Sequence, residues 1–115
     1  MSDAPVDREA LLDLVDRDLA FLERLIETFR EDCEDYLQSI RAAIERGDAK
    51  ALADEAHGLK GAAGHLQAEP VRAAAHRLEQ LGRADELERA AAVFRRLEDA
   101  VDRLLPALER VVDEA

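Results

Sequence analysis

The sequence predicts an all-α protein, an antiparallel four-helix bundle with a short additional N-terminal helix. Most of its 115 residues are Ala, Leu, Glu, Asp and Arg, which are mostly strong helix formers. Apolar residues recur at steps of three and four along most of the chain, as on one face of a helix. Short turns separate these segments, which favours antiparallel neighbours. The length suits one domain, residues 1–115, with the bundle over about 18–113.

The N-terminal half predicts a short helix followed by a long one. Asp7 is suited to cap a first helix over about 7–16. From Asp18 an apolar stripe continues for about seven turns. Its members are Leu22, Leu25, Ile26, Phe29, Cys33, Tyr36, Leu37, Ile40 and Ile44. Gly47 then provides a C-terminal stop, and Asp48 is the N-cap of the next helix.

Two shorter helices follow in the middle of the chain. The third helix is expected from about Ala49 to Leu66, with its core face formed by residues at helical spacing. Pro70 opens the fourth helix, at a position where its missing N–H does no harm. Gly82 is expected to close that helix.

The last helix has a start signal and an internal interruption. Asp85, with Glu88 three residues later, resembles a capping box. The apolar stripe that follows extends almost to the C-terminus. Pro106 falls within it and is expected to kink the helix or to end its regular part.

Composition excludes several classes of function. A net charge of −11 argues against binding to nucleic acid and disfavours an anionic membrane surface. No apolar run approaches the ~20 residues that span a bilayer, and the N-terminus lacks a signal peptide, so we expect a cytoplasmic protein. Cys33 is the only cysteine, which leaves no intramolecular disulfide or cysteine-based zinc site. On the apolar stripe it is expected to be a buried, inert thiol.

The third helix carries a histidine on its outward face. At about 100° per residue, His57 points away from the apolar positions of its helix. Ala53, Gly61 and Gly64 all fall within about 40° of it. Small residues therefore surround the imidazole, and Lys60 is the one large neighbour.

The glycines of this helix require an explanation, because each interior glycine destabilises a helix by roughly 1 kcal/mol relative to alanine. Two explanations are possible. The glycines could clear the way for a bulky partner that docks onto His57, or they could allow close helix packing within the bundle. Gly58 fits the second explanation. Gly61 and Gly64 flank the outward histidine and fit the first, so Ala53 and Gly64 are assigned to a partner-binding surface.

The side chains at this face suit phosphoryl chemistry. Imidazole is a competent nucleophile near neutral pH, and the Lys60 ammonium lies one turn away, within reach of a phosphoryl group on the ring. The segment from His57 to Arg83 carries a local charge of +2, which suits an anionic group. A solvated histidine–lysine surface pair is the alternative interpretation.

Other chemistries have less support in the sequence. His57 and His65 are separated by about 12 Å along a helix axis, too far for one metal ion to bind both. His76 is not accompanied by a paired carboxylate–histidine motif. No glycine loop follows a strand to hold a nucleotide. We therefore expect no metal site, no cofactor and no kinase activity of the chain's own.

The segment from His57 to Ala63, HGLKGAA, resembles the motif of the histidine-containing phosphotransfer (HPt) domain family, H-x-L-K-G followed by small residues. The flanking segments also look like that family, with Phe29 in a long helix, then Gly47-Asp48, and further on a helix with Leu78-Glu79. The resemblance therefore covers essentially the whole chain. It implies that His57 is the phosphoacceptor, that Lys60 steadies the phosphoryl group and that Gly61 gives access. Such domains carry a phosphoryl group between receiver-domain aspartates and bind no nucleotide, and the Mg²⁺ that transfer requires belongs to the receiver.

The resemblance implies response-regulator receiver domains and a sensor or hybrid histidine kinase as partners, and we expect a monomer. The initiating methionine suggests a freestanding domain, although the same module occurs within larger kinases.

Two positions depart from the family pattern: His65 stands where members often have Asn, and Gln67 where they often have Gly. The alternatives are a helical adaptor that binds a receiver or partner helix without phosphotransfer, and a metal-binding bundle.

Overall fold

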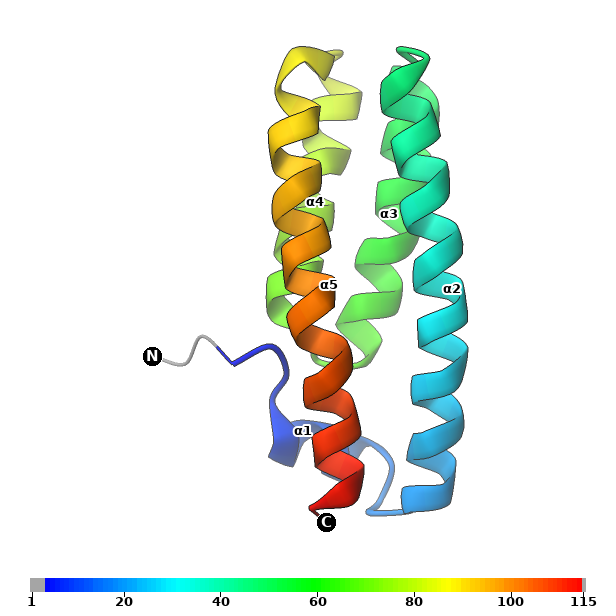
Figure 1. Cartoon of the computed structure of the whole chain (residues 1–115), viewed down its shortest axis with the longest axis vertical. Helices are drawn as coiled ribbons and strands as arrows, with labels where there is room; N and C mark the ends of the chain where they lie inside the picture. Colours follow the sequence, from blue (N-terminus) through cyan, green and yellow to red (C-terminus); the bar gives the residue numbers. More distant parts are fainter. Residues whose placement is uncertain (1–3, 115) are drawn as a thin grey trace.

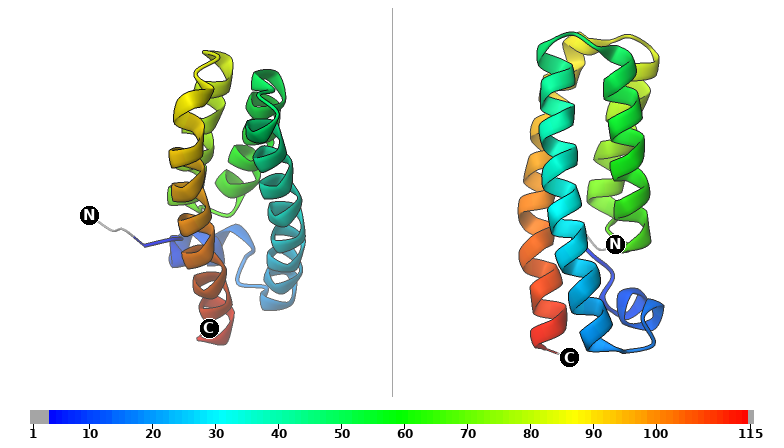
Figure 2. Two further views of the ribbon diagram at one scale, coloured as in Figure 1. Left: turned by 45° about the horizontal axis from the view of Figure 1, so that its top comes forward. Right: turned by 90° about the vertical axis from the view of Figure 1, so that its right-hand side faces the viewer.

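The structure, a computed structural model, describes residues 4–114 and forms an elongated helical bundle (Figure 1). Helices α2 and α5 run its full length, and α3 and α4 pair beside one part of it. The short helix α1 lies across the remaining end, below the turn that joins α3 to α4 (Figure 2). The elements are α1 (Arg8–Leu14), α2 (Leu19–Glu45), α3 (Ala49–His65), α4 (Glu69–Arg83), the 3₁₀ turn η1 (Leu87–Arg89) and α5 (Ala90–Asp113). The predicted all-α bundle with its short N-terminal helix is confirmed.

Side chains and one glycine define the helix ends in the N-terminal half. Asp7 accepts a hydrogen bond from the Ala10 amide at 3.1 Å, and Asp48 accepts one from the Ala51 amide at 3.0 Å. Gly47 follows α2 with φ +69°, a conformation that glycine adopts without a steric penalty. The predicted caps at Asp7 and Asp48, and the stop at Gly47, are confirmed.

The predicted signals between α4 and α5 are wrong. α4 continues past Gly82 to Arg83, and Asp85, with φ +55°, takes the left-handed position that follows the helix. The 3₁₀ turn then leads into α5, whose N-cap residue Arg89 makes no side-chain cap hydrogen bond. Asp85 therefore contributes to the end of α4 and not to a capping box for α5.

Pro106 does not end the last helix, as α5 continues through it to Asp113. A proline in a helix interior removes one backbone hydrogen bond and costs about 3 kcal/mol. Pro106 itself is exposed, whereas Ala107, Leu108 and Val111 beyond it are buried. Apolar packing of the last turns therefore holds the helix together after the proline.

The core runs the length of the bundle and consists mainly of aliphatic side chains from all five α-helices, together with Phe29 and Phe94. Cys33 lies within it at 1% exposure, which confirms its predicted burial, and this burial raises the pKa of its thiol to about 11. Between residues 4 and 114, the large apolar side chains that remain exposed are Leu14 and Phe21. Among the residues described, no helix is long and apolar enough to cross a membrane.

Helices α3 and α4 approach each other unusually closely at Gly82. A Cβ at this position would lie 2.8 Å from the Ala49 carbonyl oxygen and 2.8 Å from the Ala53 amide nitrogen. Only a residue without a side chain fits between the two backbones. This close contact brings the side chains of α4 one turn earlier within reach of the outward face of α3.

Candidate functional site

The candidate site is centred on His57, midway along α3. Its side chain is 62% exposed, as the helical wheel predicts. Tyr36 on α2 packs against the same turn, because a Cβ at Gly58 would lie only 2.7 Å from the tyrosine Cε1. α4 contributes the groups on the opposite side of the histidine. The imidazole thus stands on the surface between α2 and α4.

A buried carboxylate lies directly behind this imidazole. Glu79 on α4 is 5% exposed, and it is the one charged residue among residues 4–114 that is buried. Its Oε2 lies 3.0 Å from His57 Nδ1, and Arg83 donates to the same oxygen at 2.7 Å. The other oxygen, Oε1, forms an ion pair with Lys60 Nζ at 2.6 Å. Glu79 therefore joins the three polar residues of the site into one cluster.

Glu79 is ionised throughout the neutral pH range. The pKa of its carboxyl is lowered to about 2, mainly by the Lys60 ammonium and further by Arg83 and His57, while burial acts in the opposite direction. Contacts with Lys60, Arg83 and His57 compensate the negative charge of this carboxylate. A buried charge without such partners would be strongly unfavourable.

The ionised carboxylate determines which ring nitrogen of His57 carries the proton. A carboxylate can only accept hydrogen bonds, so Nδ1, at 3.0 Å from Oε2, is the protonated nitrogen of the neutral ring. Nε2 then keeps its lone pair. The arrangement can therefore present an unprotonated, nucleophilic nitrogen at a ring that is more than half exposed.

Lys60 lies one turn after His57, with its side chain 24% exposed. The ion pair with Glu79 holds its ammonium beside the imidazole instead of leaving it free in solvent. With a neutral histidine, the formal charges of Lys60, Arg83 and Glu79 sum to +1. The site can therefore attract an anionic group to the ring.

The small residues around His57 do not share one role. A Cβ at Gly61 would meet no atom within 4 Å, so the space beside the imidazole is open there. At Gly64 a Cβ would make ordinary contact with Arg72 Cδ at 3.7 Å. Gly58 packs against Tyr36, as its position on the wheel suggested.

The assignment of Ala53 to an exposed partner surface is wrong. Ala53 is only 4% exposed, because its backbone and Cβ lie against Gly82 of α4. The helical wheel measured its direction relative to the core face of α3 alone. The neighbouring helix covers a second face of α3, and Ala53 lies on that face.

The other two histidines form no hydrogen bond with the cluster. His65 is exposed at the last residue of α3. His76 Nδ1 is 3.8 Å from Glu79 Oε1, too far for a hydrogen bond, and its side chain is 45% exposed. No group of three or more metal-ligating side chains occurs within residues 4–114.

Sequence reasoning did not predict the role of Glu79 in the site. Glu79 is 22 positions from His57, and no short motif links the two. One signal was available: Glu79 adjoins Leu78 and lies four residues after Ala75, on the side of α4 that is otherwise apolar. An acidic residue at such a position requires a partner, and a nearby cation or histidine is the usual one.

An apolar groove lies between α2 and the C-terminal part of α3. Its volume is about 420 Å³, and it contains the exposed side chain of Phe21 together with Leu14 of α1. Ala62 and His65 form its α3 wall, one to two turns beyond His57. Exposed apolar surface of this kind is typical of a protein contact.

Comparison with known proteins gives a consistent result. The sequence model of a family described as the Hpt domain matches residues 24–107. The chain is 24% identical over 102 residues to the phosphorelay intermediate protein rdeA of Dictyostelium discoideum, and it spans 40% of that protein's length. It is also similar to the crystal structure of histidine-containing phosphotransfer protein B (HptB) from Pseudomonas aeruginosa PAO1, with a TM-score of 0.90 and 28% identity over 99% of each chain.

Proposed function

The chain belongs to the Hpt domain family, and on this premise we propose that it is a phosphocarrier in a multistep phosphorelay, with His57 as the residue that carries the phosphoryl group. The observation that carries the proposal is the exposed imidazole whose Nδ1 lies 3.0 Å from a buried, ionised carboxylate. That contact leaves Nε2 free to act as the nucleophile. The similarity to HptB along the whole chain supports the same role.

The proposed transfer requires one bond to form and one to break. The lone pair of Nε2 attacks the phosphorus of a receiver aspartyl phosphate, and the phosphorus–oxygen bond to the aspartate breaks, so its electron pair leaves with the aspartyl carboxylate. Nδ1 keeps its proton during this step, and the ring becomes cationic. Glu79 Oε2, at 3.0 Å, stabilises that positive charge. The reverse step returns the phosphoryl group to a second receiver.

Lys60 is proposed to offset the negative charge of the transferring group. The ion pair with Glu79 fixes one side of its ammonium, and the remaining donors are available to phosphoryl oxygens. The Mg²⁺ that such transfer uses is assigned to the acidic pocket of the receiver. On this proposal the chain itself supplies the nucleophile and a positioned cation and binds no nucleotide.

Receiver domains are proposed to dock over the open space at Gly61 and the apolar groove next to it. Gly61 leaves room for the partner's active site to approach His57. The exposed Phe21 and Leu14 offer apolar contact area close by. A small interface of this kind suits a partner that must dissociate after each transfer.

Family membership implies interaction with receiver domains and histidine kinases. Beyond this, we propose that the chain acts as a monomer, has no kinase activity of its own and does not bind nucleic acid. The net charge of −11 supports the last point, because nucleic acid would be repelled.

Intact-mass spectrometry tests the proposal directly. The protein is incubated with a phosphorylated receiver domain and Mg²⁺, with His57→Gln as the matched control. We expect an adduct of one phosphoryl group on the wild type only, labile in acid and stable in alkali. If receivers that bind the protein leave it unmodified, the protein is an adaptor and not a carrier.

A further inference from the structure

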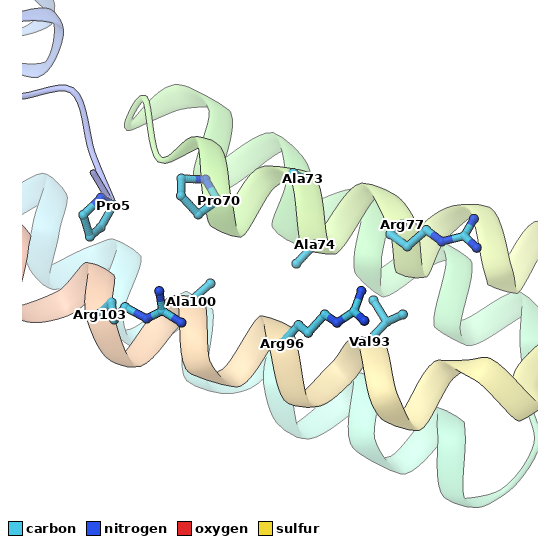
Figure 3. Close-up of a pocket in the computed structure, with 9 residues that line it drawn as sticks. All are labelled: Pro5, Pro70, Ala73, Ala74, Arg77, Val93, Arg96, Ala100 and Arg103. Carbon is cyan, nitrogen blue, oxygen red and sulfur yellow. The ribbon is translucent and has the colours of Figure 1, made fainter. Parts of the chain in front are cut away.

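A second groove lies between α4 and α5, and it differs in chemistry from the rest of this acidic protein (Figure 3). It has a volume of about 360 Å³. Its walls are apolar, with Pro5, Pro70 and Val93 and several alanines. Three arginines, Arg77, Arg96 and Arg103, line it, and no acidic residue does.

These three arginines form no ion pair or hydrogen bond with any residue between 4 and 114. Half of the chain's fourteen arginines do form such ion pairs, as expected where acidic residues are in excess: Arg8, Arg17, Arg30, Arg41, Arg46, Arg72 and Arg83. The groove therefore concentrates uncompensated positive charge in a protein of net charge −11.

The arginines lie along the groove and do not converge on one point (Figure 3). Arg96 and Arg103 are two turns apart on α5, which separates them by about 10 Å along the helix axis. A single phosphate or carboxylate is too small to contact all three. A ligand that matches them must be elongated, with several negative charges and with apolar groups between them to cover the proline and alanine walls.

We propose that this groove binds an acidic segment of a partner protein, with carboxylates spaced to meet Arg77, Arg96 and Arg103. Arginine is well suited to the role, since its guanidinium binds carboxylates in a bidentate manner. Single-stranded nucleic acid is the less suitable elongated anion. The groove has no aromatic side chain on which a base could stack, and the surrounding protein is strongly acidic.

The groove and the phosphoryl-acceptor site lie on different faces of α4. Arg77 and Glu79 are two residues apart, about 200° around the helix, and Glu79 faces His57. A segment in the groove therefore leaves His57 accessible to a receiver. The proposal does not depend on phosphotransfer by the chain, and the two are tested by separate measurements.

Fluorescence anisotropy with a labelled peptide tests the groove. The probe is a peptide of four helical turns with glutamates one and two turns apart on one face and leucines beside them, and its control is a scrambled peptide of equal composition. The groove variant combines Arg77→Glu, Arg96→Glu and Arg103→Glu. The matched control combines Arg89→Glu, Arg95→Glu and Arg110→Glu, which reverses the charge of three exposed arginines outside the groove.

We expect the groove variant to bind the patterned peptide about tenfold more weakly or worse, and the control variant to bind within about twofold of wild type. Circular dichroism and His57 phosphorylation are expected to be unchanged in both variants. Should the groove variant unfold, Arg77→Gln, Arg96→Gln and Arg103→Gln take its place.

Three results would overturn the proposal: equal loss in both variants, equal binding of the scrambled peptide, or tighter binding of a single-stranded oligonucleotide of the same charge. Sedimentation velocity supplies a fourth. Self-association that the groove variant abolishes would assign the groove to a second copy of the chain. Loss of phosphotransfer in the His57→Gln protein, in contrast, has no bearing on this groove.

Discussion

His57 Nδ1 lies 3.0 Å from Oε2 of Glu79, a carboxylate that is buried although its histidine partner is exposed. The contact joins α3 to α4 and is possible because Gly82, one turn further along α4, lets the two backbones approach. The close packing of α3 against α4 thus determines which ring nitrogen of the exposed His57 carries the proton. The same carboxylate also positions the Lys60 ammonium, so one buried group orients both functional side chains.

Removing the charge of Glu79 should slow phosphotransfer without blocking docking. In Glu79→Gln the amide no longer favours the Nδ1-protonated ring and no longer stabilises its positive charge. Carboxylates that orient metal-bound histidines typically contribute 10- to 100-fold to affinity or activity, and we expect a loss of similar size in the phosphotransfer rate here. The ¹⁵N shifts of His57 should move toward a mixture of tautomers. An unchanged tautomer with a slower rate would show that Glu79 acts on the positive charge of the ring and not on the tautomer, and an unchanged rate would contradict both roles.

Lys60 should contribute to the rate without setting the tautomer. Lys60→Ala removes the positioned ammonium but leaves the His57–Glu79 contact in place. We expect slower transfer from a phosphorylated receiver, unchanged ¹⁵N shifts at His57 and partial rescue in Lys60→Arg, where a cation is restored. Equal rates in wild type and Lys60→Ala, measured by quenched phosphotransfer, would contradict this role.

The depressed pKa of Glu79 predicts a specific loss of stability in acid. Its folded-state pKa is about 2, against an ordinary value of 4.5. Because the folded pKa is the lower one, its contribution is fully present above pH 4.5 and is lost progressively as the pH falls from 4.5 toward 2. Urea unfolding of wild type and Glu79→Gln across this range should give a stability difference that shrinks with acidification. A constant difference would contradict the assignment.

The sequence predicted the helices better than the site, because helix ends depend on local interactions and the site depends on how two helices pack. Caps such as Asp7 and Asp48 act within one turn, so local sequence placed them correctly, although the same kind of signal misplaced the cap at Asp85. The contact between His57 and Glu79 depends on how two helices pack, and no local signal specifies that distance or rotation. Ala53 was misplaced for the same reason, since a wheel for one helix does not reveal which faces its neighbours cover.

Substitution by alanine should stabilise the protein at Gly61 of α3 and destabilise it at Gly82 of α4. Gly61→Ala adds a Cβ in open space and removes the helix penalty of glycine, so we expect the free energy of unfolding to rise by about 1 kcal/mol. Gly82→Ala places a Cβ 2.8 Å from two backbone atoms of α3 and should destabilise by about 1–3 kcal/mol. Urea denaturation of both variants measures the contrast. If Gly61 serves access to His57, the stabilised Gly61→Ala protein should also transfer phosphate more slowly.

Gln67 should prove to be a strained residue. It follows α3 with φ +58°, and its amide and that of Ala68 close the helix onto the carbonyls of Gly64 and Ala63. This left-handed position is the one that glycine favours at a helix end, which explains why the HPt pattern often has glycine here.

We therefore expect Gln67→Gly to raise the free energy of unfolding by about 0.5–1 kcal/mol, since relief of the left-handed strain outweighs the greater chain entropy of glycine in the unfolded state. Thermal and urea unfolding should be compared between Gln67→Gly and Gln67→Ala. Both variants lack the glutamine side chain, but only Gln67→Ala keeps a Cβ, so their difference measures the backbone strain at this position. Phosphotransfer should be unchanged in both variants, because this turn lies almost three helical turns beyond His57. A Gln67→Gly protein no more stable than the alanine variant would show that the turn is not strained.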